Sequence, residues 1–273
     1  MTTLIARGAR YGTMFRTLGE RGEGAFIPFA MLGDPDPARS LAAIRLLVSA
    51  GADALELGLP FSDPMADGPV IQAAATRALA RGVRRAHCWR IVASVRDEFP
   101  TLPIGLLVYA NLVFHRGDPE RFYADAAGAG VDSVVVADLP LIESRSSVAA
   151  ARVHGIAPVF IAPPNVSSDR LAAIAAEGEG YTYVTSRGGV TGEDQRLRGD
   201  RNRLIEELKA LGAPPPVLGF GISTPAQVRA AMSAGAIGAI SGSAIVRRIA
   251  EGGDVAGFVR EMKAATQRED GNG

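Results

Sequence analysis

A glycine that ends a helical stretch and is followed at once by an apolar strand recurs along this chain. The clearest copies are Ala50-Gly51-Ala52-Asp53, Ala129-Gly130-Val131-Asp132 and Ala234-Gly235-Ala236-Ile237. Glycine suits the end of a helix because it adopts the left-handed conformation at little cost. A unit that repeats in this way predicts that helices and strands alternate along the chain.

Eight apolar segments are candidates for strands, and helical segments lie between them. We predict strands at residues 25–32, 53–59, 104–109, 133–139, 157–162, 181–186, 216–220 and 237–242. We predict helices at residues 36–50, 70–81, 86–98, 118–129, 142–153, 168–177, 200–211, 224–234 and 254–265, and a first helix at about 11–20. Such continuously apolar strands are typical of parallel sheets that helices cover. The pattern favours an α/β fold, a (β/α)8 TIM barrel with an extra N-terminal helix, over an open doubly wound sheet.

One barrel would account for the whole chain. The 273 residues, of which 47% are hydrophobic, can form one large core, so we expect a single TIM-barrel domain over residues 1–273. Residues 1–23 would form the N-terminal helix region, which would plug the bottom of the barrel. The polar tail, residues 267–273, is expected to fray.

The second predicted strand carries a carboxylate between small residues. Because side chains alternate along a strand, Glu56 shares a face with Ala54 and Gly58, which leaves room for a ligand. A glutamate in a partly apolar space has its ionised form disfavoured, and this suits proton transfer near neutral pH. Asp67 follows in the next loop and would border the same space. On the pattern alone, Glu56 could equally be a structural ion-pair partner, and Asp67 could serve only the turn before Gly68.

Glycines follow the last two predicted strands, where TIM barrels often bind phosphate. The segments are Gly219-Phe220-Gly221-Ile222-Ser223 and Ser241-Gly242-Ser243-Ala244. Glycine lets backbone N–H groups approach an anion closely, and a helix N-terminus adds partial positive charge. One such loop could be no more than a tight turn, but paired loops on consecutive strands favour a phosphate site.

A long glycine-rich segment, Ser186-Arg187-Gly188-Gly189-Val190-Thr191-Gly192-Glu193, follows the sixth predicted strand. Its composition is typical of a mobile lid that excludes water, and Gly192 could reach the phosphate when the lid closes. An ordinary surface loop is the alternative. The position beside a tyrosine-bearing strand and the phosphate loops favours the lid.

Composition excludes several other functions. The formal net charge is zero, so bulk electrostatics favour no nucleic-acid partner. Cys88 is the only cysteine, which excludes an internal disulfide and fits a cytoplasmic location, and no apolar run is long enough to span a membrane.

The sequence also predicts neither a metal site nor a lysine that could form a Schiff base. The three histidines, His87, His115 and His154, are scattered without carboxylates or thiols at ligand spacing, so we predict no metal site. Lys209 and Lys263 are the only lysines, and both fall in predicted helices rather than at strand ends. A barrel of this kind that cleaves a carbon–carbon bond would use neither a metal nor a Schiff base.

Several segments together resemble a known family. The run Leu55-Glu56-Leu57-Gly58-Leu59-Pro60-Phe61-Ser62-Asp63-Pro64-Met65-Ala66-Asp67-Gly68 is similar to the signature of the tryptophan synthase alpha subunit. Further blocks resemble the family in the family's order, namely residues 24–29, 103–112, 131–133, 137–138, 180–183, 189–192 and 219–223. The resemblance covers nearly the whole chain, from Gly24 to about Ile249.

This resemblance implies a TIM-barrel lyase that cleaves indole-3-glycerol phosphate to indole and glyceraldehyde 3-phosphate without a cofactor of its own. Glu56 would shuttle protons, Asp67 would accept a hydrogen bond from the indole N–H, and Tyr183 would support Glu56 or the substrate. The remaining binding residues implied are Phe29, Leu107, Tyr109 and Phe220 around the ring, Gly192, Gly221, Gly242 and Ser243 at the phosphate, and Arg187, Gly188, Gly189 and Thr191 in the lid.

The resemblance also implies a partner. This would be a beta subunit that carries pyridoxal phosphate and condenses indole with serine, in an α2β2 assembly, with Asp63, Pro64 and Asn111 facing it. Two residues depart from the family pattern. Gly188 stands where Ser or Thr is common, which could loosen the lid, and Met31 stands where Thr is frequent, which we expect to cause local repacking.

Two alternatives remain at this point. Another phosphate-binding barrel, such as indole-3-glycerol phosphate synthase, would need a catalytic lysine in the barrel mouth, and neither lysine is placed there. A catalytically weak barrel that acts mainly as an activating partner of a beta subunit is the other, and the presence of both Glu56 and Asp67 argues against it.

Overall fold

Eight parallel strands form a closed barrel in the computed structural model of the chain, which describes residues 8–185 and 194–268. Each strand pairs with the next one in sequence, and β1 pairs with β8 to close the ring. The strands are β1 (Ala25–Met31), β2 (Leu55–Gly58), β3 (Ile104–Val108), β4 (Ser133–Val136), β5 (Ala157–Ala162), β6 (Thr182–Val184), β7 (Pro216–Gly219) and β8 (Gly238–Ser241). The predicted TIM barrel is confirmed.

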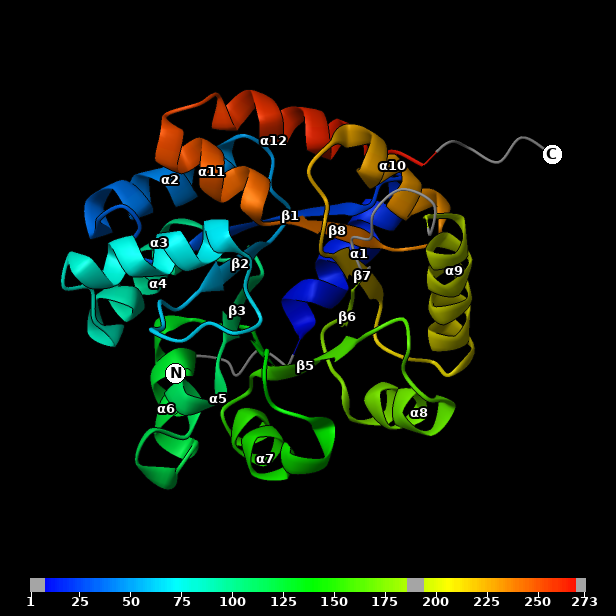
Figure 1. Cartoon of the computed structure of the whole chain (residues 1–273), viewed down its shortest axis with the longest axis horizontal. Helices are drawn as coiled ribbons and strands as arrows, with labels where there is room; N and C mark the ends of the chain where they lie inside the picture. The colour runs from blue at the N-terminus through cyan, green and yellow to red at the C-terminus, as the bar shows by residue number, and fades with distance from the viewer. Residues whose placement is uncertain (1–7, 186–193, 269–273) are drawn as a thin grey trace.

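Helices surround the barrel on its outside, as Figure 1 shows, except for the first helix, which lies across one end of the barrel. They are α1 (Ala9–Glu20), α2 (Pro37–Ser49), α3 (Pro69–Ala80), α4 (Arg85–Glu98), α5 (Ala110–Val113), α6 (Glu120–Ala129), α7 (Arg145–Val153), α8 (Ser168–Glu177), α9 (Asp194–Ala210), α10 (Pro225–Ser233), α11 (Ser243–Glu251) and α12 (Val255–Ala264). Two 3-10 turns, η1 (His115–Gly117) and η2 (Leu141–Glu143), complete the set.

Two of these helices were absent from the sequence prediction. The short α5 follows β3 directly, and Asp138 accepts a hydrogen bond from the Ala110 N–H at its first turn, 2.7 Å away. Helix α11 begins at Ser243, within the segment predicted to bind phosphate, and buries Ala244, Ile245 and Val246. A short amphipathic segment next to glycine is easily mistaken for loop, because its packing partners are distant in sequence.

Alternation along the strands divides the core into two regions. Side chains such as Val217 and Ile240 point into the barrel, whereas Leu218 and Ala239 point outward against the helices. Glu56, on β2, is 1% exposed and belongs to the inward set with Ala54. A carboxyl group therefore lies inside an otherwise apolar barrel.

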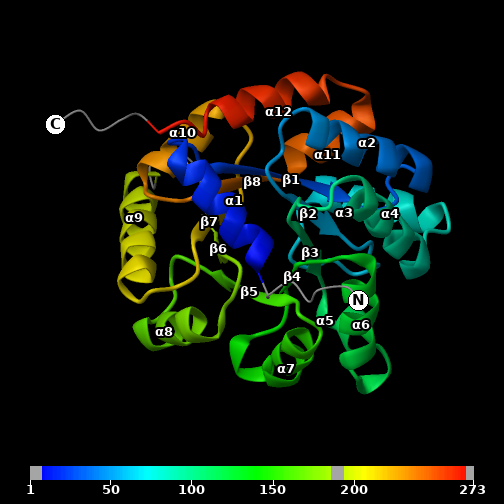
Figure 2. The same ribbon diagram turned by 180° about the vertical axis from the view of Figure 1, so that it is seen from behind.

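Helix α1 closes the N-terminal end of the barrel, as predicted, and Figure 2 shows it crossing that end. Tyr11 is buried there, and its hydroxyl lies 2.9 Å from the Ser133 Oγ. The Tyr11 ring also packs against the Tyr181 ring, with centroids 5.3 Å apart. The apolar face of α1 thus continues the barrel core.

The expectation that the tail frays from residue 267 is wrong for its first two residues. Gln267 pairs with Glu23 in an antiparallel bridge, and the Arg268 N–H donates to the Gly22 carbonyl at 2.8 Å. Residues 269–273 lie outside the described residues. Across the described residues, no helix combines the length and the apolar character that crossing a membrane requires.

Candidate active site

The C-terminal ends of the strands surround a cavity of about 370 Å³. Its lining includes Glu56 from β2, Asp67 from the loop after β2, Tyr183 from β6, and the segments that follow β7 and β8. The volume falls in the range of small-molecule sites, and most of the wall is apolar. Residues far apart in sequence meet here because the ends of all the parallel strands lie at one face of the barrel.

Burial makes Glu56 a weak acid. Desolvation raises the pKa of its carboxyl group to about 8, against a weaker opposing effect of the hydrogen bond from Tyr181. The Tyr181 hydroxyl donates to Glu56 Oε1 at 3.0 Å. Glu56 Oε2 has no hydrogen bond to any described residue, and Glu56 lines the cavity. The side chain is therefore largely protonated at neutral pH and can donate a proton to a ligand.

Tyr181 is a site residue that the sequence analysis missed. We expected Tyr183 to support Glu56 or the substrate, and Tyr183 does line the cavity, but the hydrogen bond to Glu56 comes from Tyr181. The signal was present in the sequence, since residues two apart on a strand share a face, and Tyr181 and Tyr183 both point inward.

Asp67 is held at the cavity by its neighbours. The Tyr109 hydroxyl donates to Asp67 Oδ2 at 2.9 Å and accepts from the Ala66 N–H at 3.1 Å. The Tyr109 ring stacks on Phe61, with centroids 5.2 Å apart. Desolvation raises the pKa of Asp67, and the Tyr109 hydrogen bond opposes that rise. Tyr109, which we expected to hold the substrate ring, instead positions Asp67 and is not among the residues lining the cavity.

Small residues near Glu56 do not all leave space for a ligand. A Cβ added to Gly58 would lie 2.5 Å from the ring of Phe29, so this ring occupies the space beside Gly58. A Cβ added to Gly219 would lie 2.4 Å from the ring of Tyr183. These glycines therefore make room for two aromatic rings, and the rings form cavity wall together with Leu107 and Phe220.

The predicted phosphate residues come together on one side of the cavity. Gly221, Gly242 and Ser243 all line it. Gly221 has a φ of 74°, and the preceding Phe220 has a φ of 129°, which is unusual for a residue with a side chain. Helix α11 begins at Ser243, so its N-terminal N–H groups and partial positive charge lie beside the cavity. This arrangement suits an anionic group.

The remaining predicted residues are partly accounted for. The predicted lid lies outside the described residues, and so do its members Arg187, Gly188, Gly189, Thr191 and Gly192. The departure from the family pattern at Gly188 therefore lies outside them too. Asp63 and Asn111 are exposed and Pro64 is half-buried, and Ser62 donates a hydrogen bond to Asp63. Met31 is buried in the barrel interior.

A charged pair joins the segment after β1 to α3. Asp34, which follows β1, accepts hydrogen bonds from the Nε and Nη2 atoms of Arg77 on α3, both at 2.8 Å. Among the described residues, no group of three or more His, Cys, Asp or Glu side chains is placed to hold a metal ion.

Fold and site together define a TIM-barrel protein in which two carboxylates, two glycine-containing segments and a helix N-terminus surround one largely apolar cavity. The family model described as "Tryptophan synthase alpha chain" matches residues 15–270. The chain belongs to the tryptophan synthase alpha chain family.

Relatives and solved structures agree with this assignment. The tryptophan synthase alpha chain of Shewanella baltica is 53% identical over 277 residues, covering 97% of this chain and 100% of the relative. That of Yersinia pseudotuberculosis is 54% identical over 266 residues, covering 94% and 99%. A structure of Mycobacterium tuberculosis tryptophan synthase superposes with a TM-score of 0.86 at 30% identity, covering 97% of this chain and 100% of that one.

Proposed function

We propose that this chain is the alpha subunit of a tryptophan synthase (EC 4.2.1.20) and cleaves indole-3-glycerol phosphate to indole and glyceraldehyde 3-phosphate. The observation that carries the proposal is that Glu56 and Asp67 line the same cavity as Gly221, Gly242 and Ser243. The apolar wall would hold the indole ring, and the glycine amides with the α11 N-terminus would bind the phosphate.

Glu56 would act first as an acid and then as a base. Protonated at neutral pH, it gives its proton to indole C3, and the ring becomes positively charged. The resulting carboxylate then takes the proton of the glycerol hydroxyl next to the ring. As that oxygen forms the aldehyde, the bond to C3 breaks and its electron pair neutralises the ring. Glu56 ends in its starting protonation state, so no net proton is consumed.

Asp67 would stabilise the charged intermediate. Its carboxylate accepts a hydrogen bond from the indole N–H, and its negative charge offsets the positive charge that protonation of C3 creates. Tyr109 holds the carboxylate in place through Oδ2, which leaves Oδ1 for the ring nitrogen. Tyr181 would keep Glu56 within reach of both C3 and the hydroxyl.

A beta subunit is the partner implied by the family. We propose that it carries pyridoxal phosphate, receives the indole and assembles as α2β2 in the cytoplasm. The exposed loop around Asp63, Pro64 and Met65 and the exposed Asn111, on the same face as the cavity mouth, would contact it. Docking would then act directly on the loop that carries Asp67.

A lyase assay with and without a beta subunit tests this function. Wild type should release indole from indole-3-glycerol phosphate, and Asp67→Asn should nearly abolish the release while circular dichroism stays unchanged. Stimulation of a beta subunit by a wild-type chain that has no lyase turnover of its own would contradict the proposal and support a scaffolding role.

A further inference from the structure

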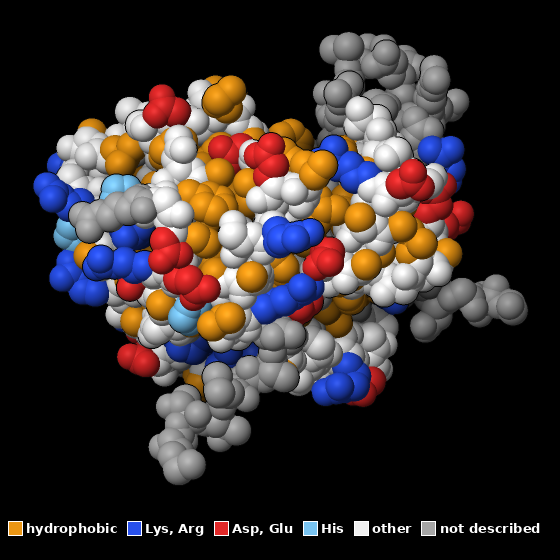
Figure 3. Space-filling model, turned by 90° about the horizontal axis from the view of Figure 1, so that it is seen from below, with side chains coloured by type: hydrophobic (Ala, Val, Ile, Leu, Met, Phe, Trp, Pro, Cys, Tyr) orange, Lys and Arg blue, Asp and Glu red, His pale blue; other side chains and the backbone are white. Residues whose placement is uncertain are grey.

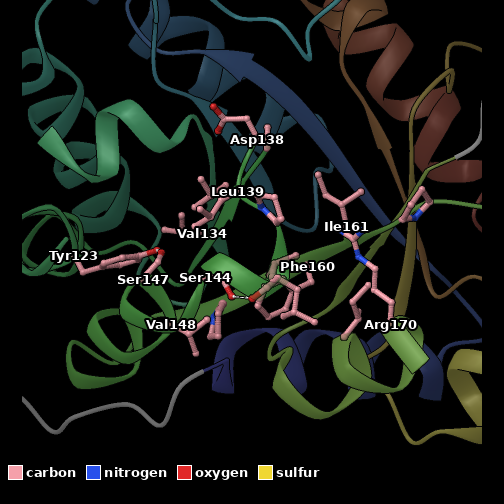
Figure 4. A pocket seen from close by; sticks show the side chains of 18 residues that line it. Tyr123, Val134, Asp138, Leu139, Ser144, Ser147, Val148, Phe160, Ile161 and Arg170 are labelled. Carbon is pink, nitrogen blue, oxygen red and sulfur yellow. Dashed lines mark hydrogen bonds between the residues drawn. The ribbon is translucent and has the colours of Figure 1, made fainter. Parts of the chain in front are cut away.

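A second cavity lies outside the barrel wall, between the sheet and its covering helices. It has a volume of about 300 Å³ and is bounded by β4 and β5 on one side and by η2, α7 and α8 on the other (Figure 4). This volume is at the lower end of the range for small-molecule sites. Figure 3 views the molecule from the side on which α7 lies, where apolar side chains gather between charged ones.

The wall of this flank cavity carries both apolar and polar groups. Val136, Val148, Phe160 and Ile174 contribute to its wall, and Phe160 is only partly buried by its neighbours. These apolar side chains, with an aromatic ring among them, suit a flat apolar body of about two fused rings.

A buried hydroxyl pair supplies a hydrogen-bond donor to this cavity. Tyr123 Oη and Ser147 Oγ lie 2.6 Å apart, and the two residues, 2% and 3% exposed, both line the cavity. Two hydroxyl groups carry two protons, and the bond between them uses only one. The other proton has no acceptor among the described residues. A buried donor without an acceptor is costly, and a ligand that accepts a hydrogen bond would remove that cost.

An exposed arginine lies at the edge of the cavity. Arg170 extends from α8 toward β5 in Figure 4, and it forms no ion pair or hydrogen bond with any described residue. Nearby Arg152, by contrast, pairs with Glu177 and Glu179. Asp138 lies at a different edge and would repel an anion, so an anionic group would be placed at Arg170. A guanidinium group matches the geometry of a carboxylate.

From these observations we propose that the flank cavity binds a small bicyclic aromatic carboxylate with a hydrogen-bond acceptor in its ring. The carboxylate pairs with Arg170, the rings lie along Phe160 and Val148, and the ring acceptor takes the free proton of the Tyr123–Ser147 pair. This site is separate from the active site, although Ala137 and Ile161 line both cavities.

Calorimetric titration of the full chain with quinoline-6-carboxylate tests the proposal. Arg170→Gln should weaken binding about fivefold or more, because the charge-assisted hydrogen bond is lost. Arg145→Gln is the matched control, since Arg145 is also exposed and without a described partner but lies outside this cavity, and it should bind like wild type. Arg170 is exposed and has no ion pair or hydrogen bond within the part of the chain that the structure describes, so its replacement should leave the fold intact. Equal affinity in wild type and Arg170→Gln, or no binding to wild type, overturns the proposal.

Two further titrations locate the ligand. Naphthalene-2-carboxylate lacks the ring nitrogen and should bind more weakly than the quinoline, and equal binding would overturn the role of the hydroxyl pair. Phe220→Ala, which alters only the active-site cavity, should leave quinoline-6-carboxylate binding unchanged. Loss of binding in Phe220→Ala with retention in Arg170→Gln would place the ligand in the active site and overturn the proposal, whatever the outcome of the lyase assay.

Discussion

Each end of the barrel buries a carboxyl group, but the two groups differ greatly in the cationic and hydrogen-bond partners that they have. At the N-terminal end, Asp132 receives Arg10 Nη1 and Arg96 Nη2, each at 2.6 Å, and the Ile104 N–H at 2.8 Å. At the C-terminal end, Glu56 receives one neutral hydroxyl, that of Tyr181 at 3.0 Å. Both side chains are buried, at 7% and 1% exposure.

This difference separates a stabilising end from a reactive end. A second group at the N-terminal end follows the same rule, because Lys263 Nζ lies 2.9 Å from Glu23 Oε2 and 3.0 Å from Asp53 Oδ2. Charges that are paired in this way hold α1, α12 and the strand starts together. A buried acid without a cation keeps its proton, and that proton is what the proposed reaction uses.

The largest effect is expected at the reactive end. Glu56→Gln should lower lyase turnover by about a thousandfold or more, since general acid–base catalysis is typically worth 10²–10⁴. The midpoint of thermal unfolding should not fall, because the amide keeps the Tyr181 hydrogen bond. Glu20→Gln, at an exposed glutamate on α1, is the control and should retain full activity. Full turnover in Glu56→Gln would refute the role of this residue.

The N-terminal end should respond in stability rather than in chemistry. Asp132→Ala leaves Arg10 and Arg96 without their shared carboxylate and removes the acceptor of the Ile104 N–H, so unfolding free energy should fall by about 3–5 kcal/mol. Denaturant titration measures this, with the exposed Asp97→Ala as control. Turnover per folded molecule should be retained. An unfolding free energy equal to that of wild type would show that the comparison between the two ends is wrong.

A smaller effect is expected at the support of Asp67. Tyr109→Phe removes the hydrogen bond that opposes the rise in the pKa of Asp67, so this pKa should rise further. We expect kcat/KM to fall about tenfold, the loss of one hydrogen bond to a charged group. The acid limb of the pH–rate profile should move to higher pH, because Asp67 must be ionised to stabilise the ring. An unmoved limb would mean that Tyr109 does not set the ionisation of Asp67.

A separate effect is expected on the pH dependence of stability. Glu56 has an ordinary pKa of 4.5 in the unfolded chain and about 8 in the folded one, so the folded state holds a proton that the unfolded state has lost between these values. The stability that Glu56 contributes through this extra bound proton is complete below pH 4.5. It declines as the pH rises to about 8, by at most about 1.4 kcal/mol per pH unit. Glu56→Gln should lack this component in denaturant titrations at pH 5 to 8. Identical slopes in both proteins would contradict the raised pKa.

Local patterns in the sequence were enough for the barrel and for most of the residues at its mouth. The prediction of eight apolar strands separated by helices, with Glu56 on the second strand and Asp67 in the loop after it, required only the alternation rule and the knowledge that parallel strand ends converge. Helix α11 was missed because its apolar face packs on elements distant in sequence. The function came from the resemblance of whole segments to a family, which local patterns alone could not supply.

The sequence by itself determined which side chains point into the barrel and at which end each lies, because both follow from strand periodicity and chain direction. Only the tertiary structure decided which of them touch. The hydrogen bond to Glu56 comes from Tyr181 and not from Tyr183. Tyr109 forms a hydrogen bond with Asp67 and does not line the cavity. The ring of Phe29 fills the space beside Gly58. Contacts of this kind depend on distances across the barrel, between residues up to 125 positions apart, and no local pattern encodes those distances.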